Sequence, residues 1–278
     1  MIDVKDRIST YPGRVKMTPV AGQDNTYDMV RADEPIEPGT PINRALFQAF
    51  ITDMEAMRQQ IDDKIFELSQ RVRVGDLTDG MEFGLYENGV LVPFIKLSNS
   101  YMSVSAPLVI RKNCVVSAPL TDPGETYYEG CRADRWLNTT YLAQLDEATQ
   151  SVIRDVRVET SYSGGIGTVI RKIFLPSLYE YYMTSNQGIS IENNFISYFA
   201  PQERRVALLN GTPTNHWTRS IDRYRDTAAY ITPSGEHELG TPSVVNAGIR
   251  PMFTLPLDYE VTVGIPSTAN VMATAEVI

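Results

Sequence analysis

The chain contains few of the residues on which enzyme and metal chemistry most often depend. Its 278 residues include two cysteines, Cys114 and Cys131, and two histidines, His216 and His237. Two cysteines are too few for a disulfide framework or a four-cysteine zinc site. They predict two free, buried thiols, and a single bridge between them is the alternative. The sequence has no H-E-x-x-H motif, EF-hand loop or cysteine–histidine cluster. We therefore expect no metal and no cofactor.

The sequence also lacks long apolar runs and a basic charge balance. No segment approaches the ~20 apolar residues that a membrane span needs, and the first ten residues have no apolar core of the kind found in signal peptides. With 34 acidic and 25 basic side chains, the formal charge is -9 and the pI is near 4.9. Such a surface is poorly suited to nucleic-acid phosphates or anionic membranes. We expect a protein that is made in a cytoplasm, inserts in no membrane and binds no nucleic acid.

No catalytic signature is present either. The sequence contains no G-x-S-x-G nucleophile elbow whose serine His216 could activate. The stretch S-G-G-I-G at 163–167 is neither a P-loop nor a dinucleotide fingerprint and predicts a flexible hairpin tip. Glycosidase action needs two carboxylates that face each other across a cleft, and among 34 acidic residues some pair always looks plausible. We predict a protein that is not an enzyme.

Three zones of the chain differ in composition. Residues 1–40 are polar and rich in turn-forming Pro and Gly, which predicts an extended attachment arm. Residues 41–75 predict one long helix, since no Gly or Pro interrupts them between Pro41 and Arg73. Residues 76–278 carry short β-like runs among frequent Gly, Pro and Asn, which predicts a compact β-rich domain with some helix. The predicted fold class is therefore α+β.

The predicted helix carries a single apolar stripe. Thr40 and Pro41 suit its start as N-cap and first helical residue. The stripe consists of Phe50, Met54, Met57, Ile61, Ile65, Leu68 and Val72. These positions repeat every eleven residues, so the stripe runs nearly straight along the helix. A narrow apolar seam on a long, otherwise charged helix predicts a self-associating coiled coil. Packing on the chain's own domain is the alternative, and two repeats do not decide between a dimer and a trimer.

Local signals divide the third zone further. The E-N-G triplet at 87–89 lies between two apolar runs and predicts a hairpin over 83–97. Apolar residues at helical spacing predict a helix over about 137–153. The other predicted strands are 108–112, 171–177, 205–209 and 252–257.

The N-terminal segments resemble a known class of protein. V-K-D-R-I-S-T-Y-P-G-R-V-K-M-T-P-V at 4–20, Y-D-M-V-R-A-D-E-P at 27–35 and G-T-P-I-N-R-A-L-F at 39–47 resemble the start of many tail-fibre proteins from phages of Gram-positive bacteria. The resemblance implies a virion protein of the tail tip or fibre, docked to tail or baseplate proteins through its N-terminus. It also implies a homotrimer, since fibres of this type are usually trimeric.

A second resemblance covers roughly residues 92–258. Its segments are W-L-N-T-T-Y-L at 136–142, I-F-L-P-S at 173–177, Y-F at 198–199, L-N-G-T at 209–212, H-W-T-R-S at 216–220 and G-I-R-P-M-F-T-L-P at 248–256. They are similar to a domain at the ends of such fibres whose pattern resembles the C-type-lectin and formylglycine-generating-enzyme fold. In that fold the H-W-T-R-S and G-I-R-P strands pair near the middle of the domain. The calcium-binding triplets of such lectins are absent, and neither cysteine matches the reactive pair of the enzymes.

Residues 214–237 have the composition of a recognition surface, because Tyr and Trp supply rigid contact area and Arg, Asn and Asp supply directional hydrogen bonds. Within and beside this stretch, Trp217, Arg219 and Arg250 are assigned to the core and to buried hydrogen bonds. The predicted receptor contacts are Asn215, Asp222, Tyr224, Arg225, Tyr230 and His237.

These features predict a homo-oligomeric phage tail-fibre protein. It would dock to the particle by its N-terminal arm and bind a host cell-surface receptor, a glycan or a protein, by its C-terminal domain. A structural baseplate or fibre adaptor and a cell-surface glycan depolymerase are the alternatives.

Overall fold

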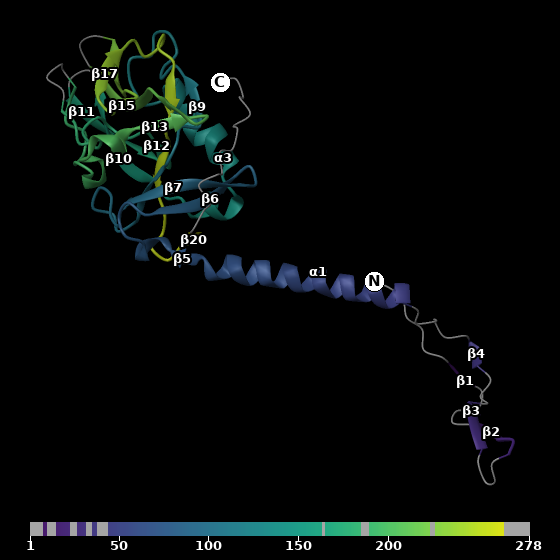
Figure 1. Cartoon of the computed structure of the whole chain (residues 1–278). Coiled ribbons are helices and arrows are strands. Elements are labelled where there is room, and N and C mark those ends of the chain that lie inside the picture. Colours follow the sequence, from purple (N-terminus) through teal and green to yellow (C-terminus); the bar gives the residue numbers. More distant parts are fainter. Residues whose placement is uncertain are drawn as a thin grey trace. The chain divides into compact units, whose positions relative to one another are not determined.

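The computed structural model describes residues 8–9, 15–22, 27–31, 35–37, 44–162, 165–184, 189–222 and 226–263 (Figure 1). The chain divides into two units, residues 1–66 and 67–278. Within the first unit two short antiparallel pairs form: β1 (Ile8–Ser9) with β4 (Pro35–Glu37), and β2 (Val15–Pro19) with β3 (Tyr27–Arg31).

Helix α1 spans Arg44–Ser69 and lies within the predicted range 41–75. Four side chains of the predicted stripe are more than half exposed: Phe50, Met54, Met57 and Ile61. Ile65 and Leu68 are part of the helix, but their side chains lie outside the described part of the chain. Val72 has left the helix. It belongs to strand β5 (Arg71–Arg73), pairs with Val261 and packs against the core of the second unit.

The predicted α+β fold class with its long oligomerising helix is therefore wrong. The chain is mainly β, with 37% of residues in strands and 22% in helices, and the predicted coiled coil is unsupported. The physical reason lies at Val72, the last member of the eleven-residue series Phe50–Ile61–Val72. Backbone pairing with β20 (Glu260–Thr262) places Val72 in a sheet. The apolar stripe of the helix therefore ends before this position. Self-association and the three-part division at residues 40 and 75 stay predictions.

Two sheets form the body of the second unit (Figure 1). The larger one has the order β12 (Ile173–Phe174), β19 (Met252–Thr254), β8 (Leu108–Arg111), β7 (Val90–Ser98), β6 (Glu82–Glu87), β20 and β5. The smaller one has the order β17 (His237–Gly240), β16 (Thr227–Ile231), β15 (His216–Asp222), β18 (Ala247–Ile249) and β9 (Val116–Ala118). Two separate hairpins are β10 (Val156–Tyr162) with β11 (Gly165–Arg171), and β13 (Ala207–Leu209) with β14 (Thr212–Thr214).

The strand predictions for the domain are confirmed: the hairpin is one residue longer at each end than predicted, and the other four strands are shorter. The E-N-G hairpin is β6–β7, and both turn residues have positive φ, 49° at Asn88 and 77° at Gly89. A two-residue hairpin turn of this kind needs positive φ at both positions, and Asn-Gly provides it at low cost. The remaining predicted strands are β8, β12, β13 and β19. Of the stretch 163–167, residues 165–167 belong to β11, and residues 163 and 164 lie outside the described residues.

The predicted helix over 137–153 is wrong as a single element. The structure has α2 (Arg132–Trp136), a π-helical turn (Leu137–Tyr141), α3 (Leu142–Gln144) and α4 (Glu147–Val152). The break comes from Asp146, whose side chain caps α4 by accepting the Thr149 amide at 3.0 Å. The Asp146 amide itself donates to the carbonyl of Tyr86 at 3.0 Å, which ties the break to strand β6. Short 3-10 turns cover Val74–Asp76, Ser197–Phe199 and Gln202–Arg205.

The pairing implied by the second resemblance is present, because β15 lies parallel to β18 with His216 opposite Gly248. The three residues assigned to the fold are fully or almost fully buried. Trp217 donates its indole N–H to the Ala118 carbonyl at 2.9 Å, and Arg250 donates to the Arg111 carbonyl at 3.0 Å. Buried donors of this size need such partners. The structural assignment of Trp217, Arg219 and Arg250 is confirmed.

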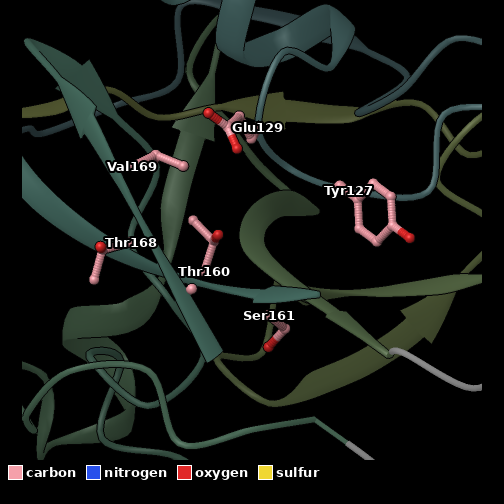
Figure 2. Close-up of a pocket in the computed structure, with 7 residues that line it drawn as sticks. Tyr127, Glu129, Thr160, Ser161, Thr168 and Val169 are labelled. Carbon is pink, nitrogen blue, oxygen red and sulfur yellow. The ribbon is translucent and has the colours of Figure 1, made fainter. Parts of the chain in front are cut away.

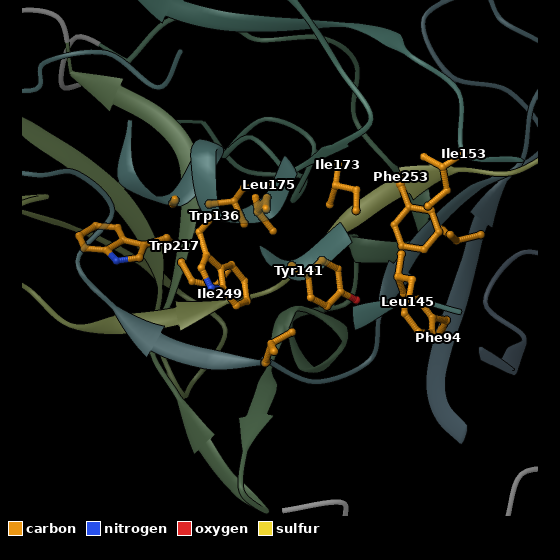
Figure 3. Close-up of a cluster of buried hydrophobic side chains, with 14 of the residues drawn as sticks. Phe94, Trp136, Tyr141, Leu145, Ile153, Ile173, Leu175, Trp217, Ile249 and Phe253 are labelled. Carbon is orange, nitrogen blue, oxygen red and sulfur yellow. The ribbon is translucent and has the colours of Figure 1, made fainter. Parts of the chain in front are cut away.

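Aromatic side chains from both sheets and from the helical segment fill the core of the second unit (Figure 3). Phe94 and Phe253 meet edge to face at 5.5 Å, and Trp136 stacks on Tyr141 at 5.7 Å. Burying each such side chain contributes about 1.5–3 kcal/mol. A second cluster contains Tyr101, Phe174, Tyr181 and Phe199. It lies beneath the segment that forms the candidate site.

Both cysteines are free and buried, which confirms the prediction of two unbridged thiols. Burial raises the pKa of Cys114 and of Cys131 to about 12. These thiols are therefore protonated and unreactive at neutral pH.

Strand β18 passes Cys114 so closely that Gly248 is required there. A Cβ at Gly248 would lie 2.5 Å from Cys114 Sγ and 2.9 Å from its Cβ. We predict that Gly248→Ala lowers the free energy of unfolding by about 1–3 kcal/mol through overpacking. Gly240→Ala is the matched control, since its Cβ would meet only the ends of the Tyr230 and Val245 side chains at 3.0 Å. Urea unfolding should show the larger loss at Gly248, and equal losses would contradict the close approach.

Candidate functional site

A buried ion pair joins strand β15 to the segment that follows β12. Arg219 and Glu180 are both 0% exposed, and Arg219 Nη1 lies 2.5 Å from Glu180 Oε2. Arg219 also donates to the carbonyls of Leu175 and Glu159, each at 2.7 Å. Burial alone would lower the pKa of Arg219, but the Glu180 carboxylate outweighs it and raises that pKa. The guanidinium therefore stays charged and holds three segments together.

The Glu180 carboxylate has three further donors. The Tyr101 hydroxyl donates at 2.8 Å, the Asn193 side-chain amide at 2.6 Å and the Ser177 backbone amide at 2.8 Å. Burial raises the pKa of Tyr101 well above its ordinary value, so this hydroxyl keeps its proton. A carboxylate surrounded by four donors in a dry interior has one stable position.

A second buried carboxylate, Glu192, anchors the far end of the same segment. Its Oε1 accepts the backbone N–H of Ser161 and the Ser161 hydroxyl at 2.6 Å, and its Oε2 accepts the Ser220 hydroxyl. The Ser177 hydroxyl donates to the Glu192 carbonyl at 2.9 Å. Burial raises the pKa of Glu192, and the Arg219 charge and the hydrogen bonds from Ser161 and Ser220 offset this only in part. These contacts fix the residues on either side of Glu192.

The anchored segment presents three aromatic rings at the surface. We call Tyr179, Tyr182 and Phe195 the aromatic platform. Phe195 stacks on Tyr179 at 3.8 Å between ring centroids and meets Tyr182 at 4.5 Å. Tyr182 is 44% exposed and Phe195 40%, and the neighbouring Ile191 is 59% exposed. Three large apolar side chains in one exposed place are typical of a binding surface.

The backbone beneath the platform is strained. Tyr182 has φ 62° and Asn193 has φ 65°. For a side chain as bulky as tyrosine this conformation is uncommon, costs of order 1–3 kcal/mol, and often marks a functional site. The anchoring carboxylates Glu180 and Glu192 stand next to these two positions in the chain and hold them in place.

The platform is also uncharged. Between residues 176 and 199 the only ionisable acids or bases are Glu180 and Glu192, apart from tyrosines, and both carboxylates are fully buried. Among the described residues of this stretch, the exposed ones are Tyr182, Thr184, Ile191, Asn194, Phe195 and Ser197. In a chain with a net charge of -9, the described exposed side chains of this segment are aromatic, aliphatic, amide and hydroxyl groups that carry no charge.

A separate pocket of about 350 Å³ opens beside the β10–β11 hairpin (Figure 2). It is lined by Tyr127, Glu129, Thr160, Ser161, Gly167, Thr168 and Val169. Tyr127 and Glu129 come from the loop that precedes α2, and the other residues come from the hairpin (Figure 2). The loop is anchored by the buried Tyr128, whose hydroxyl accepts the Leu175 amide at 3.0 Å.

A second hollow, of about 560 Å³, contains three cationic side chains, Arg135, Arg171 and Lys172. Arg171 is bound by Asp134 through two nitrogens, each 2.8 Å from a carboxylate oxygen. Arg135 is paired with Asp122 and Glu125. Because two of its three cations are already neutralised, this hollow has little excess charge for an anionic ligand.

The predicted receptor residues do not gather in one exposed place in the part of the chain that is described. Asn215 directly precedes β15 and Asp222 ends it, so the two lie about 23 Å apart at the rise of a strand. Asp222 is 2% exposed and Tyr230 9%, and the Tyr230 hydroxyl donates to Glu238 at 2.6 Å.

Three further predicted contacts complete the set. His237 is partly buried in β17 opposite Ile231. Tyr224 and Arg225 lie outside the described residues. Receptor contact by any of the six stays a prediction, and the burial of Asp222 and Tyr230 leaves these two little surface with which to make it.

Sequence reasoning missed the aromatic platform. The run Y-E-Y-Y at 179–182 was the available signal, because two adjacent tyrosines point to different sides of the chain and one of them is then exposed. Phe195 lies thirteen residues further on, and its stacking on Tyr179 depends on the buried carboxylates, which no local pattern reveals.

In the described residues, no helix combines the length and the apolar character that a membrane crossing requires. The same residues contain no group of three or more His, Cys, Asp or Glu side chains placed to hold a metal ion.

Residues 107–257 match a protein family described as "Domain of unknown function (DUF6273)". The matched range includes the platform, the pocket and the buried ion pair. No curated protein and no solved structure matches the chain.

The buried ion pair yields a prediction for stability. Removing one partner leaves the other charge buried and uncompensated, so Arg219→Met and Glu180→Gln should each cost about 3–5 kcal/mol. The double variant should cost clearly less than the sum, which urea unfolding would measure as a coupling energy. The exposed pair Lys112–Glu82, at 2.7 Å, is the control and should couple by at most about 1 kcal/mol. Additive losses at Arg219 and Glu180 would contradict the account of the cluster.

A buried histidine predicts acid sensitivity. His216 Nε2 lies 3.1 Å from the Tyr181 hydroxyl, and burial together with the Arg250 charge lowers the pKa of His216 to about 3. Because the folded pKa lies below the unfolded value of about 6.5, this group's contribution to stability is complete above pH 6.5. It is lost as pH falls toward 3, by up to about 1.4 kcal/mol per pH unit.

The measurement is the free energy of unfolding in urea at several pH values between 7 and 4. His216→Gln should reduce the pH slope relative to the wild type. His237→Gln, at a partly exposed position, should leave the slope unchanged. A slope that is the same in all three proteins would show that His216 is not responsible.

Proposed function

The chain belongs to the DUF6273 family, and we propose that it is a phage tail-fibre protein that binds a host cell-surface glycan. In this proposal the C-terminal unit recognises the receptor, and the N-terminal arm docks to tail or baseplate proteins. The chain works in the virion, as a self-associated fibre, without cofactor or enzymatic activity.

The attachment role is supported by the N-terminal resemblance to tail-fibre proteins, which covers segments between residues 4 and 47. It is also consistent with a polar first zone that contains only short strand pairs in its described part. Such a zone buries little apolar surface of its own, so a partner in the particle would supply the missing contacts.

The glycan-binding role is carried by one observation, the uncharged aromatic platform. Pyranose rings have an apolar C–H face that packs on an aromatic ring and hydroxyls that bond to amides and hydroxyls. Tyr182 and Phe195 offer the rings, while Asn194 and Ser197 offer exposed polar groups nearby in the chain. Tyrosine, serine and asparagine are also the residues that recognition surfaces use most.

Rigidity of the platform further favours a binding role. Phe195 and Tyr182 are held by stacking, and the segment beneath them is fixed by Glu180 and Glu192. A surface that is already ordered loses little conformational entropy when it binds. Weak single contacts would then add up when several heads of one fibre engage the same cell wall.

The alternatives make different demands. A depolymerase needs two carboxylates across a cleft, whereas the two buried carboxylates of this region are occupied by Arg219, Tyr101 and the serine hydroxyls. A structural adaptor would cover the platform with a protein partner, and the same test separates that outcome from glycan binding.

We predict that Tyr182→Ala and Phe195→Ala each weaken binding of the full chain to cell walls of Gram-positive bacteria by about tenfold or more. Truncating an exposed aromatic hot spot costs about 2 kcal/mol, and 1.4 kcal/mol is tenfold in affinity. Tyr86→Ala is the matched control, since Tyr86 is 40% exposed on strand β6, away from the platform segment in the chain. Labelled protein is titrated onto walls from a panel of strains before and after protease treatment.

Binding that survives protease treatment and is lost in the platform variants supports a glycan receptor. If wild-type protein binds only untreated walls, the receptor is a protein and the glycan proposal fails. If it binds no walls but Tyr182→Ala abolishes its incorporation into particles, the platform serves an adaptor.

A further inference from the structure

The pocket beside the β10–β11 hairpin is not used by the platform, yet it has the composition of a built ligand site. Its volume of about 350 Å³ lies at the lower end of the range for small-molecule sites. It is lined by one large aromatic ring, one carboxylate and three hydroxyl side chains, with Gly167 and Val169 between them.

The aromatic wall of the pocket is Tyr127, which is 44% exposed. Its neighbour Tyr128 is fully buried and fixes the loop, since its hydroxyl accepts the Leu175 amide. The Gly130 amide donates to Asp134 at 2.8 Å and fixes the other end of the same turn. The ring of Tyr127 is therefore presented from an anchored loop, although no core contact requires an aromatic residue there.

The hairpin side of the pocket is open because of a glycine. Gly167 stands directly opposite Thr160 in the β10–β11 register. With no side chain at Gly167, the Thr160 side chain has no cross-strand neighbour above it, and a ligand can approach the backbone closely. Thr160 and Ser161 are themselves 4% and 2% exposed, so the hydroxyls at this end are buried polar groups.

The carboxylate of the pocket belongs to Glu129. Its closest cation is Arg171, whose Nη2 lies 4.0 Å from Glu129 Oε1, at the outer limit of an ion pair. Arg171 is already bound to Asp134 at 2.8 Å. Glu129, 65% exposed at its side chain, therefore retains acceptor capacity toward the pocket, and two adjacent hydroxyls of a ligand can donate to one carboxylate.

We propose that this pocket binds one neutral pyranose unit. The apolar face of the sugar ring packs on Tyr127, two neighbouring sugar hydroxyls donate to the Glu129 carboxylate, and polar groups of the hairpin around Thr160 and Gly167 bond to the remaining hydroxyls. The inference rests on the proposed function in that the ligand is a glycan, and it adds a second, separate subsite. An anionic sugar is disfavoured because Glu129 would repel it.

Ser161 links the pocket to the platform. Ser161 is 2% exposed, and its hydroxyl donates to Glu192 at 2.6 Å. The same Glu192 anchors the segment of the aromatic platform. One buried carboxylate thus orders both surfaces, although each touches the glycan with its own residues.

The test uses the full chain and a panel of simple sugars: methyl α-glucopyranoside, methyl α-mannopyranoside, methyl β-galactopyranoside and N-acetylglucosamine. Binding is measured by saturation-transfer NMR, with a titration for each sugar that responds. We expect at least one sugar to bind with a millimolar Kd, and Glu129→Gln and Tyr127→Ala to weaken it at least tenfold. Glu147→Gln and Tyr86→Ala change a matched exposed residue elsewhere in the chain and should bind as the wild type does.

The sugar-binding outcomes test the pocket proposal independently of the proposed function. If no sugar of the panel binds, or if Glu129→Gln and Tyr127→Ala bind as the wild type does, the pocket proposal is overturned. Loss of sugar binding in Tyr182→Ala alone would move the sugar to the platform and also overturn it. The proposed function is judged by the cell-wall titrations, so platform variants that lose wall binding but keep the monosaccharide would support both.

Discussion

The buried pair of Arg219 and Glu180 is the constraint on which the rest of the C-terminal unit depends. Arg219 belongs to the central strand β15, and its guanidinium reaches two other segments through the carbonyls of Leu175 and Glu159. Glu180 in turn fixes Tyr101 and Asn193. Two charges in a dry interior are unfavourable unless their polar atoms find partners. In this pair only Arg219 Nη2 is left without a hydrogen bond, and so five stretches of chain acquire fixed positions.

That constraint converts a coil-like stretch into an ordered surface. In the described residues 176–184 and 189–199, regular secondary structure is limited to one 3-10 turn at Ser197–Phe199. Their order comes from buried carboxylates instead of backbone ladders. Tyrosine and phenylalanine side chains on the outside are thereby displayed at fixed spacing, as on a strand or helix. A binding surface can therefore be rigid without regular secondary structure beneath it.

Local signals in the sequence predicted local structure well. The Asn88–Gly89 turn, strand β8 and the buried roles of Trp217 and Arg219 follow from turn chemistry, alternation and side-chain size, all of which act over a few residues. The place of Val72 in a strand could not be predicted from local signals, because its partner Val261 lies far along the chain. The platform was missed for the same reason, since Phe195 is placed by Glu180 and Glu192. Contacts between residues far apart in the sequence thus decided both the position of Val72 and the formation of the platform.

Anchoring and contact are performed by different residues in the platform segment. Glu180, Glu192 and Ser177 face inward and carry the hydrogen bonds, while Tyr182, Ile191 and Phe195 face outward. An exchange at an outward position breaks none of those buried bonds. In the proposed role, such a segment can alter what it recognises one residue at a time while its folding stays intact. The buried carboxylates thus make this part of the chain readily evolvable.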